Sequence, residues 1–160
     1  MHQDGRVRVR VWRVSRRSRS ENAFKLVAAL PTARDYLGQV FRQASYVQTT
    51  ARRSHRCLWI EHADSISCLA IAAMVHNAAL LYSGSWDRTL KVWRIADLKC
   101  LEYIRAHDDT VNAVAAGAGV VYSGSADGRV KAWEKGKASH FLQGVLVARD
   151  GVPWYSLFEI

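Results

Sequence analysis

The sequence predicts an all-β fold of stacked, four-stranded antiparallel sheets, and two internal repeats carry this prediction. Residues 81–93 read LYSGSWDRTLKVW and residues 121–133 read VYSGSADGRVKAW, so 7 of 13 positions are identical at an offset of 40. Upstream of each run, HADSISCL at 62–69 matches HDDTVNAV at 107–114 in its alternation of apolar residues. A unit of about 40 residues built from short strands cannot bury its own apolar faces, so it must stack against copies of itself.

The chain begins with elements that differ from these repeats. Residues 6–13 read RVRVRVWR, and this alternation predicts a strand with valines on one face and arginines on the other. A polar, basic loop follows, and residues 24–30 form a second short strand. Thr32 with Asp35 three residues later resembles a capping box, which predicts the start of a short helix that continues to about residue 43.

Eight further strands are expected in the two repeats, and their residues are mostly apolar at alternate positions, as half-buried strands prefer. They are 65–72, 79–84, 89–95 and 99–105 in the first repeat, and 110–116, 119–124, 129–134 and 139–147 in the second. Sharp turns join the second and third strands of each repeat at the dipeptides 87–88 and 127–128.

This pattern resembles the WD-repeat family, in which a His near the start of each repeat precedes a run like SGSxDxTLKVW that closes on Trp. The dipeptides 93–94 and 133–134 read Trp-Arg and Trp-Glu where the family often has Trp-Asp. The resemblance covers residues 62–135. In addition, LPTARDYL at 30–37 and CLWIEHADSISCL at 57–69 look like a plant WD-repeat family of the Jingubang type.

The resemblance implies a partial WD40-type β-propeller of four-stranded antiparallel blades, with one short helix in an insertion. Propellers close with roughly 4–8 blades, so this chain is expected to form only an arc. The expected parts are the end of a blade at 1–30, a helix-containing insertion at 31–61, complete repeats at 62–106 and 107–149, and the start of a further blade at 150–160. Either 24–30 or 56–60 supplies the last strand of the first blade.

Four residue types recur together in both repeats. They are His62, Ser83, Asp87 and Trp93 in the first, and His107, Ser123, Asp127 and Trp133 in the second. A hydrolase triad needs a Ser on a strained, exposed turn, whereas these serines fall within strands and lack a GxSxG motif. The resemblance implies instead a hydrogen-bonded network from Trp through Ser and His to Asp, which would satisfy groups that are costly to bury. We therefore expect structural tetrads and no catalytic residue.

Trp86 is a candidate contact residue for a protein partner. It occupies a turn position where the second repeat has Ala126, so the turn does not require an aromatic side chain. The resemblance places these turns on one rim with the loops that precede the first strands. A bulky aromatic there, with Asp64, Arg88 and Asp109 nearby, would suit a binding anchor. Packing of Trp86 against a neighbouring blade is the alternative.

The net charge of +9 is concentrated in the first part of the chain. Residues 1–60 hold 13 Lys and Arg against 3 Asp and Glu, whereas residues 61–160 hold 10 against 11. The densest run contains Arg6, Arg8, Arg10, Arg16, Arg17 and Arg19. This run indicates either weak, non-specific binding to nucleic acid or a solvated strand face that discourages edge pairing. No aromatic residues alternate with the arginines as in a groove for single strands.

No motif predicts a metal, a cofactor or a membrane span. The cysteines are Cys57, Cys68 and Cys100, which lack metal spacing and are expected to be buried free thiols in a reducing compartment such as the cytoplasm or nucleus. The histidines outside the tetrads are His2, His55, His76 and His140, which also lack metal spacing. The longest apolar run, residues 68–75, is far shorter than the roughly 20 residues of a membrane helix.

The function expected from these features and from the resemblance is a non-catalytic scaffold for interactions with other proteins. It would present loop side chains from a rigid support and need no cofactor. The alternative is a nucleic-acid-associated module that uses the basic residues 6–19. An arc with two open ends would also expose apolar blade faces, so self-association is expected.

Overall fold

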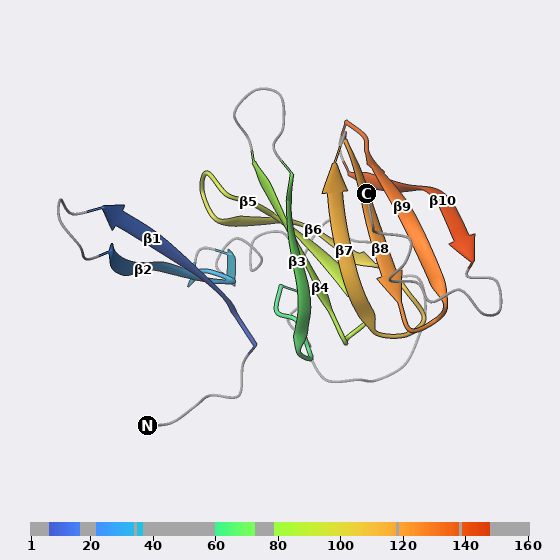
Figure 1. Ribbon diagram of the computed structural model, residues 1–160, viewed down its shortest axis with the longest axis horizontal. Coiled ribbons are helices and arrows are strands. Elements are labelled where there is room, and N and C mark those ends of the chain that lie inside the picture. The colour runs from blue at the N-terminus through green and yellow to red at the C-terminus, as the bar shows by residue number, and fades with distance from the viewer. Residues whose placement is uncertain are drawn as a thin grey trace.

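The computed structural model describes residues 7–16, 22–33, 35–36, 60–72, 79–117, 119–137 and 139–147. These residues form one two-stranded and two four-stranded antiparallel sheets (Figure 1). In each four-stranded sheet, strands that follow one another in the chain are neighbours in space. The predicted fold class, an all-β arc of four-stranded blades, is therefore confirmed.

The hairpin consists of β1 (Val9–Arg16) and β2 (Asn22–Leu30). The first blade consists of β3 (Ile66–Ala72), β4 (Leu80–Ser85), β5 (Thr89–Arg94) and β6 (Lys99–Arg105). The second blade consists of β7 (Val111–Gly117), β8 (Val120–Ser125), β9 (Arg129–Lys135) and β10 (His140–Val147). All eight blade strands lie within one residue of their predicted bounds, because their alternating pattern is bounded by clear turns.

The first strands of the chain differ more from their predicted bounds. β1 begins at Val9 and continues to Arg16, three residues beyond the expected end. β2 pairs with it, with Val9 opposite Leu30, so the segment 24–30 is a strand as predicted. Of the expected helix, residues 33, 35 and 36 are helical. The rest of that helix, and the alternative strand at 56–59, lie outside the described residues.

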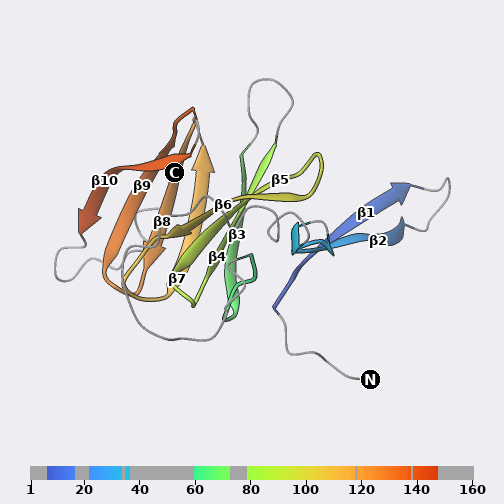
Figure 2. The ribbon, with the colours of Figure 1, turned by 180° about the vertical axis from the view of Figure 1, so that it is seen from behind.

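The hairpin, the first blade and the second blade lie side by side in chain order, as the front and rear views agree (Figures 1 and 2). The first blade is thus in the middle, and an apolar cluster lies on each of its faces. The cluster toward the second blade joins Leu80, Tyr82, Leu90 and Val92 to Val111, Val121 and Trp133. The cluster toward the hairpin joins Leu81, Trp93 and Cys100 to Val9, Leu30 and Ile60.

Asp35 fastens the start of the insertion to the first blade. Its carboxylate accepts hydrogen bonds from the backbone N–H of Thr32 at 2.8 Å and from the Thr32 hydroxyl at 2.9 Å, which is the capping interaction that the sequence predicts. Its second oxygen accepts the backbone N–H of Cys100 on β6 at 3.0 Å. One buried carboxylate therefore serves both the helix start and the sheet.

The two blades approach each other closely at Gly84 on β4. A Cβ atom at this position would lie 2.6 Å from Cys68 Sγ and 2.8 Å from Val111 Cγ1. The Ser67 hydroxyl bridges the two blades at this point. Its oxygen lies 3.2 Å from the Gly84 carbonyl oxygen of the first blade, and it donates a hydrogen bond to the Val111 carbonyl of the second blade. A glycine is required here by close packing.

We predict that Gly84→Ala lowers the free energy of unfolding by about 1–3 kcal/mol, because the added methyl group overpacks the contact between the blades. Gly117→Ala is the matched control, since no described atom lies within 4 Å of the Cβ it would add. Urea denaturation of both variants measures the difference. Equal stability of the two variants would contradict the packing argument.

Candidate functional site

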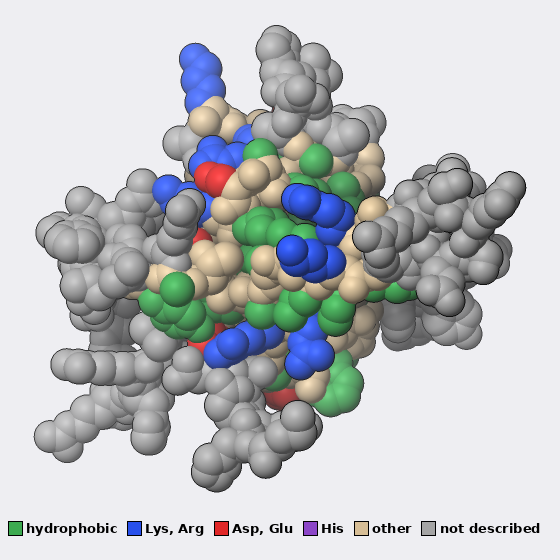
Figure 3. Space-filling view, turned by 90° about the vertical axis from the view of Figure 1, so that its left-hand side faces the viewer, with side chains coloured by type: hydrophobic (Ala, Val, Ile, Leu, Met, Phe, Trp, Pro, Cys, Tyr) green, Lys and Arg blue, Asp and Glu red, His purple; other side chains and the backbone are tan. Residues whose placement is uncertain are grey.

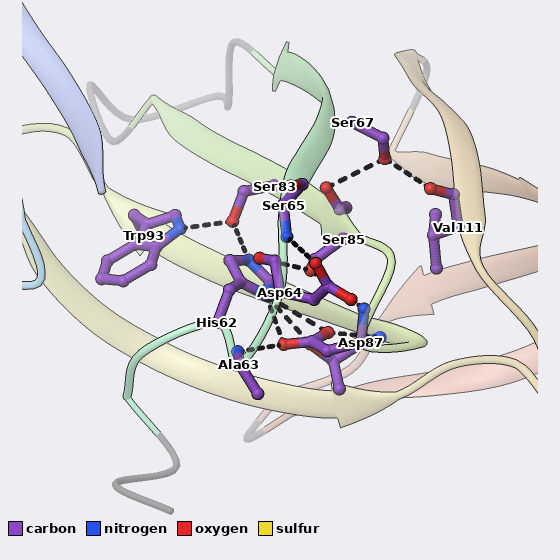
Figure 4. A network of polar contacts seen from close by, with 12 residues as sticks. His62, Ala63, Asp64, Ser65, Ser67, Ser83, Ser85, Asp87, Trp93 and Val111 are labelled. Carbon is purple, nitrogen blue, oxygen red and sulfur yellow. Dashed lines mark hydrogen bonds and ion pairs between the residues drawn. The ribbon is translucent and has the colours of Figure 1, made fainter. Parts of the chain in front are cut away.

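The structure brings the four residues of the first tetrad together in one chain of polar contacts (Figure 4). The indole N–H of Trp93 donates to Ser83 Oγ at 2.9 Å. Ser83 Oγ lies 2.8 Å from His62 Nε2, and His62 Nδ1 lies 3.2 Å from Asp87 Oδ2. The four side chains come from β5, from β4, from the loop before β3 and from the turn between β4 and β5, so the network links all of these segments.

The direction of the hydrogen bonds assigns the tautomer of His62. Because Ser83 Oγ accepts the indole N–H, its own hydrogen is free to point to His62 Nε2. The ring proton is then on Nδ1 and is donated to Asp87. Burial lowers the pKa of His62, and this effect outweighs the opposing hydrogen bond with Asp87. The buried imidazole is therefore neutral.

Asp87 is the point where the loop and the turn meet. Burial alone would raise the pKa of its carboxyl, but hydrogen bonds from His62 and Thr89 lower it to about 2. The carboxylate also accepts the backbone N–H of Ala63 at 2.7 Å and that of Thr89 at 3.0 Å. An ionised, half-buried carboxylate thus fixes the backbone on both sides of the blade's rim.

The second tetrad repeats this arrangement. Trp133 Nε1 donates to Ser123 Oγ at 2.9 Å, and Ser123 Oγ lies 2.8 Å from His107 Nε2. His107 Nδ1 lies 2.9 Å from Asp127 Oδ2, and the Asp127 carboxylate accepts the backbone N–H of Asp108 at 3.1 Å. Burial lowers the pKa of His107. Burial would raise the pKa of Asp127, but its hydrogen bonds, first that from His107, lower it.

The tetrad serines are poorly placed for nucleophilic catalysis. Ser83 and Ser123 have no exposed surface. Each hydroxyl already has an indole donor and an imidazole partner. A nucleophilic Ser must reach a substrate carbonyl beside an oxyanion hole, which a fully covered strand residue cannot do. The geometry therefore fits a structural role for both tetrads.

Trp86 stands on the rim with half of its side chain exposed, at 51%. Its backbone N–H donates to the Ser65 carbonyl at 3.0 Å, and the Ala126 N–H makes the same bond to Thr110 in the second blade. The backbone of the turn is thus fixed in the same way with or without the indole. Arg88 follows with a positive φ of 73°, where the second blade has Gly128 at 75°.

The other predicted contact residues lie on the same rim. Asp64 and Asp109 are exposed, and the carboxylate of each accepts the backbone N–H of the following residue at 2.7 Å. The Ser85 hydroxyl donates to the Asp64 carbonyl at 3.1 Å, and Ser125 does the same to Asp109. Both carboxylates are therefore exposed on loops whose backbone is fixed by hydrogen bonds.

A second polar network, which the sequence did not predict, joins the two blades. His140 on β10 is fully covered at its side chain and lies between two residues of the first blade. Its Nδ1 is 3.0 Å from Glu102 Oε1, and its Nε2 is 3.0 Å from the Tyr82 hydroxyl. Burial raises the pKa of Tyr82 to about 12. Of these three residues, only Tyr82 has an identical counterpart in the other repeat, which is Tyr122. The repeat pattern of the sequence therefore does not indicate this site.

The arginine run is described only in part. Arg8 and Arg10 are exposed on the hairpin, and Arg16 ends β1. The residues outside the described part are Arg6, Arg17 and Arg19. Trp12 follows Arg10 on the same face of β1, so one aromatic side chain lies beyond the arginines on that face. Figure 3 shows hydrophobic side chains among Lys and Arg at this end of the molecule.

The described ranges offer little support for other chemistry. Within them, no group of three His, Cys, Asp or Glu side chains could hold a metal ion. The helical residues described form no segment long and apolar enough to cross a membrane. Cys68 and Cys100 are free thiols, and burial raises the pKa of both, to about 12 for Cys100. Cys57 lies outside the described residues.

Four-stranded blades with a Trp–Ser–His–Asp network in each define the class of WD-repeat proteins. Residues 55–94 and 98–134 match the WD40 family, described as "WD domain, G-beta repeat". The two matched segments contain both tetrads. The resemblance found in the sequence is thus confirmed at the level of the WD40 family.

Two relatives and one solved structure are similar to parts of this chain. Striatin-4 of Homo sapiens is 35% identical over 60 residues, covering 35% of this chain and 8% of that protein. Small ribosomal subunit protein RACK1y of Oryza sativa subsp. japonica is 37% identical over 54 residues, covering 34% of this chain and 16% of that protein. The crystal structure of the computationally designed Ika4 protein matches with a TM-score of 0.43 and 32% identity, covering 49% of this chain and 46% of that one. The chain thus spans less than a fifth of either natural relative.

We predict that Asp127→Ala lowers the free energy of unfolding by about 1–3 kcal/mol, because it leaves buried donors without an acceptor. The control is Asp97→Ala, which removes an exposed carboxylate paired with Arg94 and is expected to cost less than about 1 kcal/mol. Thermal and urea melts of both variants give the comparison. An unchanged melting midpoint in Asp127→Ala would exclude a stabilising role for the tetrad.

The buried histidines predict that stability declines in mild acid. The pKa values of His62 and His107 are lowered in the folded protein, so their contribution is complete above the unfolded value of about 6.5 and is lost as the pH falls toward the folded values. Each histidine adds a slope of up to about 1.4 kcal/mol per pH unit in this window. Urea denaturation between pH 8 and pH 5 measures it, and a flat profile would contradict neutral, buried rings.

Proposed function

We propose that the protein is a non-catalytic interaction scaffold that binds other proteins through its rim. The rim consists of the loops 63–65 and 108–110 and the turns 86–88 and 126–128. The observation that carries the proposal is the half-exposed indole of Trp86, on a turn whose backbone bonds do not depend on it. An exposed tryptophan that the fold does not require is typical of the anchor residues of interfaces.

The tetrads support this proposal because they hold the rim rigid. The Asp87 carboxylate binds the backbone of the loop before β3, and Ser85 binds the same loop through the Asp64 carbonyl. The Asp87 N–H in turn donates to Ser85 Oγ at 3.1 Å. Side chains on such a fixed backbone lose little further backbone freedom when a partner binds, which favours affinity.

The charges of the rim indicate the chemistry of the partner. Asp64, Asp108 and Asp109 are exposed, and Arg129 Nη1 lies 2.9 Å from Asp108 Oδ2. A partner that covers the indole with an apolar pocket and offers donors around it would match this surface. WD40 repeats indicate protein interaction in general, which agrees with this assignment. We also propose that the protein is of the plant Jingubang type. This part of the proposal is supported only by the sequence resemblance of residues 30–37 and 57–69.

Trp86→Ala tests the proposal. We predict that the variant keeps its cooperative melt, since Ala126 occupies the same place in the second blade, and that it loses at least tenfold in affinity for proteins that the wild type retains. Phe141→Ala, which removes an exposed aromatic ring from β10, is the matched control. Proteins retained from a cell extract are identified with the wild type and then titrated against each variant. Equal affinity of every such protein for the wild type and Trp86→Ala would refute the rim as the contact surface.

A further inference from the structure

The contact between the two blades joins two unlike faces. The first blade contributes the face that carries Tyr82, Leu90 and Val92, which we call its tyrosine face. The second blade contributes the face that carries Val121 and Trp133, which we call its tryptophan face. The contact also buries the Tyr82–His140 hydrogen bond and an edge-to-face pair of these rings at 5.5 Å. Tyr82 is left only 1% exposed.

The hairpin meets the first blade in the same way. Trp93, on the tryptophan face of the first blade, is 1% exposed because Val9 and Leu30 of the hairpin pack near it. Val9 stands three residues before Trp12, as Leu90 stands three residues before Trp93. The hairpin therefore presents the equivalent of a tyrosine face to the first blade, and the same type of contact is made twice in one chain.

Both outer faces of this series carry exposed apolar side chains, although Val130 on the second blade is 7% exposed. On the second blade, Tyr122 corresponds to Tyr82 but is 38% exposed, and Leu146 on β10 is also exposed. On the hairpin, Trp12 corresponds to Trp93 but is 50% exposed. Its neighbours extend the apolar surface, because Trp12 pairs with Leu26 and the next pair on this face is Val14 with Phe24.

The hairpin end also exposes part of the first blade. Leu69 and Ile71 on β3 are both exposed. Their counterparts on β7, Val114 and Ala116, are partly buried because they pack against the first blade. The described hairpin has only two strands, and it packs on Leu81, Trp93 and Cys100 of β4, β5 and β6. Leu69 and Ile71 on β3 therefore stay exposed. Exposed apolar side chains therefore lie both on the hairpin and on β3.

We propose that a second copy of this chain covers these surfaces, head to tail. The tyrosine face of the second blade in one copy packs against the tryptophan face of the hairpin in the next. The two faces are the two halves of a contact that the chain already makes within itself, and the hairpin and the second blade that carry them lie at opposite ends of the molecule (Figure 2). Charge agrees with this pairing, because Arg10 lies on the hairpin face and Glu134 on the face of Val130 and Ala132.

Because the two faces differ, the contact is heterologous, and each copy can bind one neighbour at either end. Such a contact builds a closed ring or an open filament, depending on the rotation between copies. The proposal does not rest on the rim, since neither face includes Trp86. Assembly and partner binding can therefore be separated by experiment.

Two variants that each block one end test this arrangement. Tyr122→Asp places a charge on the outer face of the second blade, and Trp12→Asp places one on the hairpin. We expect the wild type to form species larger than its 18.0 kDa mass as concentration rises, and each variant alone to remain a monomer. A 1:1 mixture should form a dimer and nothing larger, because one intact face remains on each partner. Light scattering coupled to gel filtration measures the masses.

Trp86→Asp is the control, since it adds the same charge on the rim and should assemble like the wild type. A cooperative melt is required of every variant. Where Tyr122→Asp or Trp12→Asp lacks one, Leu146→Asp or Val14→Asp blocks the same face instead. A wild-type chain that stays an 18.0 kDa monomer at all concentrations would overturn the proposal. So would assembly of either blocked variant alone, or a mixture that forms no dimer.

Discussion

The ionised carboxylate of Asp87, with its counterpart Asp127, is the constraint on which each blade depends. It accepts hydrogen bonds from an imidazole and from backbone N–H groups on two separate segments, so it fixes the loop before the first strand against the turn between the second and third. The cost of burying such a charge is offset only because these donors converge on it. The position of the histidine, and through Ser83 that of Trp93, follows from the same carboxylate.

The placement of Trp93 links this polar network to the apolar packing between sheets. The indole N–H is satisfied inside its own blade, so the ring can cover the neighbouring sheet without leaving a buried donor unpaired. The opposite face of the blade carries Tyr82, whose hydroxyl has no partner within its blade in the described contacts and finds one in His140 of the next. The indole N–H of one face is therefore satisfied within the blade, whereas the Tyr82 hydroxyl of the other face is satisfied by the neighbouring blade, which makes the two faces unlike.

The blade strands and the tetrads could be predicted from the sequence because both recur. Seven identities in 13 positions fix the register of one repeat against the other, and the alternation of apolar residues fixes the strands. The His140–Glu102–Tyr82 network could not be predicted, because it joins residues from different repeats and two of them do not recur. The pairing of Leu26 with Trp12 could not be predicted either, because β2 shifts its register between the partners of Val11 and Trp12.

The rim and the sheet faces make separate demands on the chain. The backbone of the rim is satisfied by the tetrad and by Ser85, all from within one blade, so its shape is independent of what lies beyond the blade. The sheet faces depend on a neighbour, as the contrast between buried Tyr82 and exposed Tyr122 demonstrates. A molecule built in this way can change the number of stacked sheets without altering the surface that Trp86 presents. The side chains on the rim are then free to vary from blade to blade, as Trp86 and Ala126 do, while the tetrad beneath them stays the same.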